Sequence, residues 1–202
     1  MKHLLLLISL ISIFTFGAYA QSGFMQSAGY TYFFGVGKVT IEDTSGFSYD
    51  YRPTLAFNSG IYYPRINLTD SRDNNVSIGA PVALGFSGSF NSQTGSSFSF
   101  GLDLPVMLDY SIGHGCAERN KDGFGAFFGA GFGYTLSSYS YQSWYGEVSE
   151  TASTAGPMVH AGVRFPLTLG GNEMSYTIRL SFKQGLDKNK FKVFGFGLLV
   201  NL

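Results

Sequence analysis

Between residues 97 and 110 the chain alternates strictly between large apolar residues and residues that are mostly small or charged. A period of two residues is that of a β-strand, in which neighbouring side chains point to opposite faces. The apolar face is longer than the roughly 9–11 residues that a tilted strand needs to cross a bilayer. The stretch therefore predicts a membrane-crossing strand. Its apolar face consists of Phe98, Phe100, Leu102, Leu104, Val106, Leu108 and Tyr110.

The same alternation recurs in seven other segments, separated by polar or turn-forming stretches. It is weakest in the second segment, where Phe57, Ile61 and Tyr63 share a face. Pro81 and Pro105 each remove a backbone donor from a strand, so we expect local bulges there. The pattern predicts an all-β fold, an eight-stranded antiparallel up-and-down transmembrane β-barrel. The eight segments begin near Ala28, Leu55, Val76, Ser97, Phe124, Val159, Tyr176 and Phe194.

The larger apolar face of every strand is expected to point outward into lipid. The interior of an eight-stranded barrel is only just wide enough to be filled by side chains, and the large apolar groups of eight strands would overfill it. A closed barrel also satisfies its backbone hydrogen bonds in a medium without water. Amphipathic rings near strand ends are expected at the membrane interface. These are Tyr30, Tyr63, Tyr110, Tyr134 and Tyr176.

The first 20 residues are predicted to be a secretory signal peptide that is cleaved. A basic start precedes an apolar run, and Ala18 and Ala20 supply the small residues that favour cleavage before Gln21. The remaining chain, residues 21–202, is long enough for one domain, which we assign to the barrel.

Composition agrees with a barrel embedded in a membrane. Charged residues make up 13% of the chain and aromatic residues 17%, whereas a typical soluble domain is about 25% charged. Loss of Lys2 with the signal peptide lowers the basic residues from 13 to 12, against 13 acidic ones. This balance gives no electrostatic basis for nucleic acid as a partner.

The signal peptide, the eight alternating segments and the apolar strand that ends at Leu202 resemble the small eight-stranded outer-membrane barrels of bacteria, of the OmpX or OmpA membrane-domain type. The resemblance implies a location in the outer membrane, contact with its lipid and lipopolysaccharide, and recognition of the last strand by the assembly machinery. That strand usually ends in Phe in the family, and here it ends in Leu. The family topology implies periplasmic termini and four outward loops, at residues 42–50, 87–96, 137–154 and 183–190.

Four charged residues fall on the face that would point into the barrel lumen. A lone charge in so narrow an interior is costly, so we expect a polar network that plugs the lumen. In particular, Asp103 is expected to lie within bonding reach of Arg164 or Arg179. The four residues are Asp103, Asp109, Arg164 and Arg179.

The predicted loop at residues 137–154 is rich in aromatic residues, which provide contact area at a low entropic cost. It is a hypothetical surface-recognition loop, and anchoring to lipopolysaccharide is the alternative. The role expected of the protein is therefore structural or one of surface interaction, such as adhesion or recognition of an external partner. The aromatic residues are Tyr139, Tyr141, Trp144 and Tyr145.

Other functions stay open as alternatives. His160 is the one histidine on a predicted strand and would be the base of an outer-membrane lipid-modifying enzyme. Such an enzyme needs a nucleophile or a carboxylate aligned with the base, and the neighbours of His160 in the sequence supply neither. His114, Cys116 and Glu118 lie close together in a turn, at a spacing that fits no strong zinc pattern. A soluble, lipocalin-like binder of a small apolar ligand is a third alternative. We expect no catalytic residue, metal or cofactor.

Overall fold

The structure, a computed structural model, describes residues 23–37, 39–42, 48–51, 54–69, 71–91, 95–117, 120, 123–143, 146–169, 172–187 and 190–202. The predicted signal peptide lies outside the described residues. Within them, no helix is long and apolar enough to span a membrane. The strands are β1 (Phe24–Val36), β2 (Val39–Glu42), β3 (Ser48–Tyr51), β4 (Thr54–Asn67), β5 (Asn74–Gly79), β6 (Val82–Asn91), β7 (Gly95–Gly113), β8 (Gly125–Ser143), β9 (Gly146–Leu169), β10 (Asn172–Gln184) and β11 (Lys192–Asn201).

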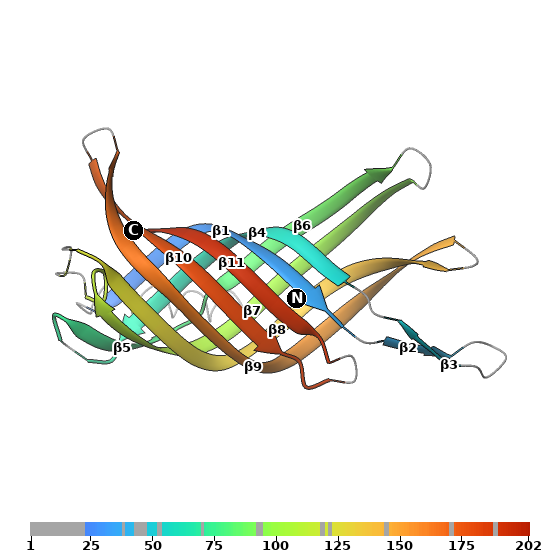
Figure 1. Ribbon diagram of the computed structural model, residues 1–202, viewed down its shortest axis with the longest axis horizontal. Helices are drawn as coiled ribbons and strands as arrows, with labels where there is room; N and C mark the ends of the chain where they lie inside the picture. Colours follow the sequence, from blue (N-terminus) through green and yellow to red (C-terminus); the bar gives the residue numbers. More distant parts are fainter. Residues whose placement is uncertain are drawn as a thin grey trace, which may run out of the picture.

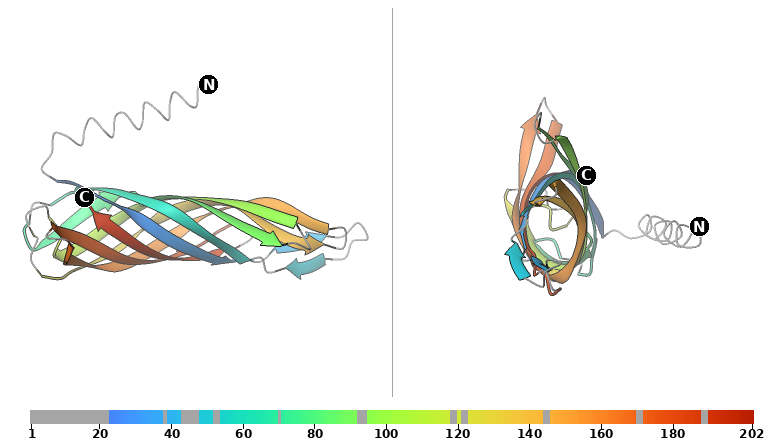
Figure 2. Two further views of the ribbon diagram at one scale, coloured as in Figure 1. Left: turned by 90° about the horizontal axis from the view of Figure 1, so that it is seen from above. Right: turned by 90° about the vertical axis from the view of Figure 1, so that its right-hand side faces the viewer.

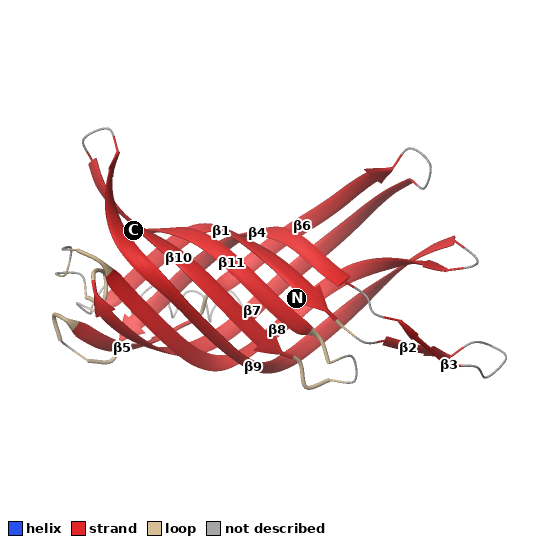
Figure 3. Ribbon diagram, in the orientation of Figure 1, coloured by secondary structure: helices blue, strands red, loops and turns tan. Residues whose placement is uncertain are grey.

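The main sheet closes on itself to form a barrel (Figures 1 and 2). It contains nine strands in antiparallel pairs, and β1 pairs with both β11 and β4 to close the ring. β5 and β6 follow one another between β4 and β7, so together they form one strand of the wall. The wall therefore has eight strands, which confirms the predicted fold. β2 and β3 form a separate hairpin (Figure 3).

On seven of the eight wall strands the predicted apolar face points outward. In β7, for example, Val106 and Leu108 are exposed, whereas Asp103 and Asp109 are buried. A water-soluble barrel such as a lipocalin would need the opposite arrangement, because a continuous apolar exterior is suited to lipid and not to water. Outward residues on the other six strands include Tyr32, Phe34, Phe86, Phe128, Phe132, Val163, Leu180, Phe194 and Phe196.

β4 is the exception, because its apolar face points into the lumen. Phe57 and Tyr63 are each 2% exposed and Ile61 is 3% exposed, while Tyr62 on the opposite face is 43% exposed. The expected outward placement of this face is therefore wrong, and so is the expected place of Tyr63 at the membrane interface.

Glycine residues on neighbouring strands explain why the interior accepts these side chains. The Phe57 ring lies where a Cβ on Gly85 or Gly101 would clash with it. On the other side of β4, Ile61 pairs with Gly29 of β1, which also has no side chain. The lumen thus contains an apolar cluster that close packing stabilises. Its members are Phe33, Phe57, Ile61, Tyr63, Ala83, Phe191, Val193 and Leu199.

Pro81 and Pro105 interrupt the sheet without the expected bulges. β5 up to Gly79 and β6 from Ala83 pair with β7 in a single register, so no residue is inserted between them. This register places Pro81 directly opposite Pro105. The two residues that lack a backbone N–H thus meet across one strand pair, and the loss of ladder hydrogen bonds is confined to one place.

The two ends of the barrel differ in their connections (Figures 1 and 2). Both termini of the barrel lie at one end, where the Leu202 amide donates to the Gln26 carbonyl at 2.9 Å. The opposite end carries the four connections predicted to face outward. Three of these connections contain strand residues. β6 and β7 pair as far as Asn91 and Gly95, and β8 and β9 pair as far as Ser143 and Gly146. β3 occupies part of the connection predicted at residues 42–50.

The loop predicted at residues 137–154 is therefore wrong and is replaced by a hairpin ribbon of β8 and β9. Its Ser, Thr, Tyr and Val residues include several of high β-propensity, so strand pairing continues after the barrel wall ends. The sequence indicates a loop because the apolar alternation stops there. Apolar residues at alternate positions are required only where one face of a strand contacts lipid, so a ribbon that extends past the membrane can be paired without them.

Candidate functional site in the barrel lumen

Charged side chains gather in the lumen. The structure adds Arg65 of β4 and Lys183 of β10, which are 2% and 1% exposed. Lys183 stands four residues after Arg179 on the same strand, so the two-residue alternation already places its side chain on the same inward face. Arg65 is identified only once β4 is known to present its odd positions inward. All four predicted residues are 1% exposed: Asp103, Asp109, Arg164 and Arg179.

The Asp103 carboxylate pairs with Lys183 and not with an arginine. Lys183 Nζ lies 2.7 Å from Asp103 Oδ1, and both side chains are at most 2% exposed. Thr135 Oγ1 donates to the same carboxylate oxygen. The predicted contact of Asp103 with Arg164 or Arg179 is therefore wrong. Alternation gives the face of a strand, but the depth at which side chains meet depends on the stagger between tilted strands.

His160 of β9 connects Asp109 to Arg179. Its Nε2 lies 2.6 Å from Asp109 Oδ1, and Arg179 Nε donates to its Nδ1 at 2.9 Å. Because a guanidinium only donates, Nδ1 carries the lone pair and the proton lies on Nε2, which donates to Asp109. Both nitrogens of this neutral imidazole are therefore bound to charged side chains. Of the two kinds of partner considered for an enzyme, a nucleophile or a carboxylate, the structure thus aligns a carboxylate, Asp109, with His160. The other ring nitrogen is occupied by Arg179.

At the end that carries the termini, Arg65 and Arg164 converge on one backbone carbonyl. Arg65 Nη2 and Arg164 Nη1 donate to the Gly115 oxygen at 2.8 and 3.1 Å. The Arg164 guanidinium also lies 4.5 Å from the centre of the Phe127 ring, a cation–π contact. Gly115 has φ +66°, a conformation that glycine adopts at little cost. The β7–β8 turn, unusually long for this end, is thus tied to the charged lumen.

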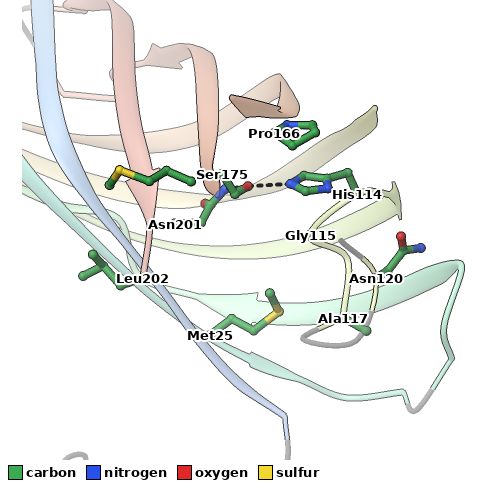
Figure 4. A pocket seen from close by; sticks show the side chains of 10 residues that line it. Met25, His114, Gly115, Ala117, Asn120, Pro166, Ser175, Asn201 and Leu202 are labelled. Carbon is green, nitrogen blue, oxygen red and sulfur yellow. Dashed lines mark hydrogen bonds between the residues drawn. The ribbon is translucent and has the colours of Figure 1, made fainter. Parts of the chain in front are cut away.

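A cavity of about 560 Å³ lies beside this turn (Figure 4). Its polar lining includes His114, whose Nε2 lies 2.7 Å from Ser175 Oγ, and Asn201, whose Nδ2 donates to the same hydroxyl at 2.6 Å. Its apolar lining includes Met25, Pro166 and Leu202. The cavity therefore combines hydrogen-bonding groups with apolar walls.

Of the three residues considered as metal ligands, His114 and Cys116 are described, and each contacts another group of the chain. Cys116 Sγ donates to the Arg72 carbonyl at 3.0 Å, and His114 contacts Ser175. Glu118 lies outside the described residues. Among the residues that the structure describes, no group of three His, Cys, Asp or Glu side chains could hold a metal ion.

The docked turn should protect the Cys116 thiol from alkylation. The side chain is 1% exposed, and burial raises the pKa of Cys116, so the reactive thiolate forms only at higher pH than in a free cysteine. Asn120→Ala removes the 2.9 Å bond from Asn120 Nδ2 to the Arg72 carbonyl. It should accelerate maleimide labelling about five- to tenfold, since one hydrogen bond contributes about 1 kcal/mol.

Mass spectrometry of labelling time courses, with the protein folded in detergent micelles, measures this effect. Leu68→Ala changes an exposed residue of the neighbouring loop and should leave the rate unchanged. Equal rates for the Asn120→Ala variant and the native protein would show that this bond does not hold the turn over the thiol.

The described residues include part of the hypothetical recognition loop. Tyr139 and Tyr141 belong to β8, where they pair with Glu150 and Val148 of β9. Trp144 and Tyr145, like the side chains of the two paired tyrosines, lie outside the described residues.

No protein-family model matches the chain, and no curated protein matches it significantly. Among solved structures, Neisserial surface protein A (NspA) is similar at 11% identity and a TM-score of 0.54, over 90% of this chain and 97% of NspA. OprG of Pseudomonas aeruginosa has 12% identity and a TM-score of 0.48, over 90% of this chain and 97% of OprG. Ail of Yersinia pestis has 14% identity and a TM-score of 0.47, over 90% of this chain and 98% of Ail. With the closed ring of eight strands, the likeness to NspA shows that this chain has the fold of the small outer-membrane β-barrel proteins of the OmpX and OmpA type.

Proposed function

We propose that the protein has a structural or surface-interaction role in a bacterial outer membrane, that it is exported by its N-terminal signal peptide, and that it is not an enzyme. The observation that carries this proposal is the contrast between a lumen into which charged and apolar side chains point and the long ribbons that project from one end of the barrel. A filled barrel is poorly suited to diffusion, whereas a projecting ribbon is suited to contact with a partner.

The lumen is plugged, in this proposal, by the charged network and the apolar cluster together. The pair of Asp103 with Lys183 and the link of Asp109 through His160 to Arg179 join strands across the interior. An eight-stranded barrel has room for little more than its own side chains. A free diffusional pore is therefore disfavoured.

The ribbon formed by β8 and β9 is the proposed recognition element. Among the described strands, residues 138–143 of β8 pair with β9 alone and residues 146–154 of β9 pair with β8 alone. At about 3.3 Å per residue, even the shorter of these segments extends about 20 Å. Backbone edges without a partner among the described strands, and an aromatic sequence with Tyr139, Tyr141, Trp144 and Tyr145, are features by which strands and rings bind extended partners.

Two further partners are proposed within the membrane. The outward apolar face would contact lipid and lipopolysaccharide. β11, with Phe194, Phe196 and Leu198 exposed on its outer face, would present the C-terminal strand to the assembly machinery.

Replacing residues 139–150 with a short turn tests the recognition role. Adhesion of cells that express this variant to a host-cell or matrix-coated surface should fall to the level of cells without the protein, because the ribbon is lost. A matched variant with the tip of the β6–β7 ribbon shortened at residues 89–97 should adhere normally. Gel mobility with and without heating verifies that both barrels assemble.

Unchanged adhesion of an assembled β8–β9 variant would overturn the recognition role. If the ribbon serves only as a lipopolysaccharide anchor, adhesion stays normal and less lipopolysaccharide copurifies with the variant.

A further inference from the structure

The outer face of the barrel carries an apolar groove of about 430 Å³ across β8, β9, β10, β11 and β1. Ala161 of β9 stands in register between Phe128 of β8 and Leu180 of β10. Because cross-strand partners share a face, the small side chain of Ala161 leaves a depression between two large ones. The rings of Phe182 and Phe194, 5.0 Å apart between centroids, also line the groove. Each of its outward-facing side chains is apolar or aromatic, so the groove is suited to an apolar group.

The groove lies next to polar side chains at the end of the barrel that carries the ribbons. On β11 the outward residue that follows Phe194 toward that end is Lys192. Lys192 pairs with Gln184 of β10, the outward residue that follows Phe182. This change from aromatic to polar side chains marks the edge of the lipid-facing band. Two residues of a strand span about 7 Å, so the long side chain of Lys192 can reach a headgroup at the edge of the groove.

Lys192 supplies a positive charge at this edge. Its side chain is exposed, and it forms no ion pair within the described part of the chain. Lys190, two residues earlier, is exposed as well. Asp187 in the same turn accepts a hydrogen bond from the Lys190 backbone amide at 2.9 Å. Basic residues at a membrane surface attract anionic headgroups, so cations beside an apolar groove match the two parts of a phosphorylated lipid.

We propose that the groove holds one acyl chain of lipopolysaccharide while a phosphate of its lipid A part binds Lys192. In lipid the hydrophobic effect does not favour one apolar contact over another, so packing and charge decide which lipid is retained. A chain in the groove is contacted from both sides, which gives more van der Waals contacts than a flat wall. Lipid A carries two phosphates, and Lys190 offers a second cation. This inference rests on the proposed location in an outer membrane and goes beyond it by naming one lipid and its site.

Native mass spectrometry of the assembled barrel tests the site. The protein in a neutral detergent is titrated separately with lipid A, phosphatidylglycerol and diacylglycerol, the last of which has acyl chains but no phosphate. One molecule of lipid A should remain bound at saturation. Its affinity should exceed that of diacylglycerol at least about fivefold, since each basic residue at a lipid surface adds to the attraction of an anionic headgroup. It should also exceed that of phosphatidylglycerol, whose single phosphate leaves Lys190 without a partner in the lipid.

Filling the groove should remove most of the affinity for lipid A. Ala161→Phe places a ring in the depression and should weaken lipid A binding at least about fivefold, through the loss of many small contacts. Ala161→Leu fills the depression in part, should have an intermediate effect, and replaces the Phe variant if that variant does not assemble. Val163→Phe is the matched control, because Val163 is exposed on the same strand and does not line the groove. It should change the affinity less than about twofold.

Removing the charge should act on the phosphate contact alone. Lys192→Gln should weaken lipid A binding about fivefold and leave diacylglycerol binding unchanged, a difference that a purely structural role of Lys192 would not produce. Arg72→Gln removes an exposed positive charge at the opposite end of the barrel and should leave the affinity for lipid A within about twofold of the native value. Gel mobility with and without heating verifies that every variant assembles.

Equal affinity of the assembled barrel for lipid A and diacylglycerol would overturn the phosphate contact. Equal or tighter binding of phosphatidylglycerol would overturn the choice of lipopolysaccharide, and equal affinities of the Ala161→Phe and Val163→Phe variants for lipid A would overturn the groove. Each of these results leaves the membrane location intact. Cell fractionation tests that location separately, and a protein found outside the outer membrane would contradict the proposed function.

Discussion

Asp103→Asn is expected to lower the free energy of unfolding by about 3–5 kcal/mol, because it leaves the Lys183 ammonium buried without its counter-charge. The two groups lie 2.7 Å apart and are almost inaccessible to solvent. Urea unfolding of the protein in lipid vesicles, followed by circular dichroism, measures the change.

The control for this prediction is the double variant Asp103→Asn with Lys183→Met. Removing the ammonium as well removes the uncompensated charge, so the double variant should recover most of the lost stability. Strict additivity of the two single substitutions would contradict a direct pair, since contacting residues show interaction energies of about 0.5–3 kcal/mol.

Phe57→Ala is expected to destabilise the barrel by about 3–5 kcal/mol, the usual cost of emptying a buried aromatic site. The ring packs against Phe33 with 5.0 Å between centroids and fills the space beside Gly85 and Gly101. The surrounding strands are held by the closed ring of hydrogen bonds, so they have little freedom to collapse into the cavity. The same urea titration in vesicles measures the loss.

Phe128→Ala is the matched control, because Phe128 is 57% exposed on the outer face of β8. Lipid tails are as apolar as the side chain and would occupy the vacated space, so the expected cost is below about 1 kcal/mol. An equal loss of stability for both variants would contradict the inward orientation of Phe57.

The membrane strands could largely be predicted from the sequence because lipid and lumen impose opposite chemistry on alternate residues. In β7 this pattern alone places Val106 and Leu108 outside and Asp103 and Asp109 inside, as the structure confirms. In β4 the same two-residue period is present, but the large apolar residues face the lumen instead of the lipid. A period of two does not say which face is inward, and the space that admits Phe57 is supplied by glycines on other strands.

The candidate site was less accessible to prediction. The sequence pattern places Asp103, Arg164, Arg179 and Lys183 on the inner face, but it does not give their depth along the barrel axis. Strand stagger brings Asp103 to Lys183 and leaves Arg179 with His160. The docking of Gly115 against two arginines was beyond prediction, because the path of a turn back toward the lumen has no periodic signal.

The sequence by itself thus determined the class of fold, the number of wall strands and the inner face of seven of them, because these follow from a local two-residue period. Only the tertiary structure decided the orientation of β4, the partners of the buried charges and the place of the cavity beside His114. These depend on ring closure and on the stagger of tilted strands, which set contacts between residues far apart in the chain.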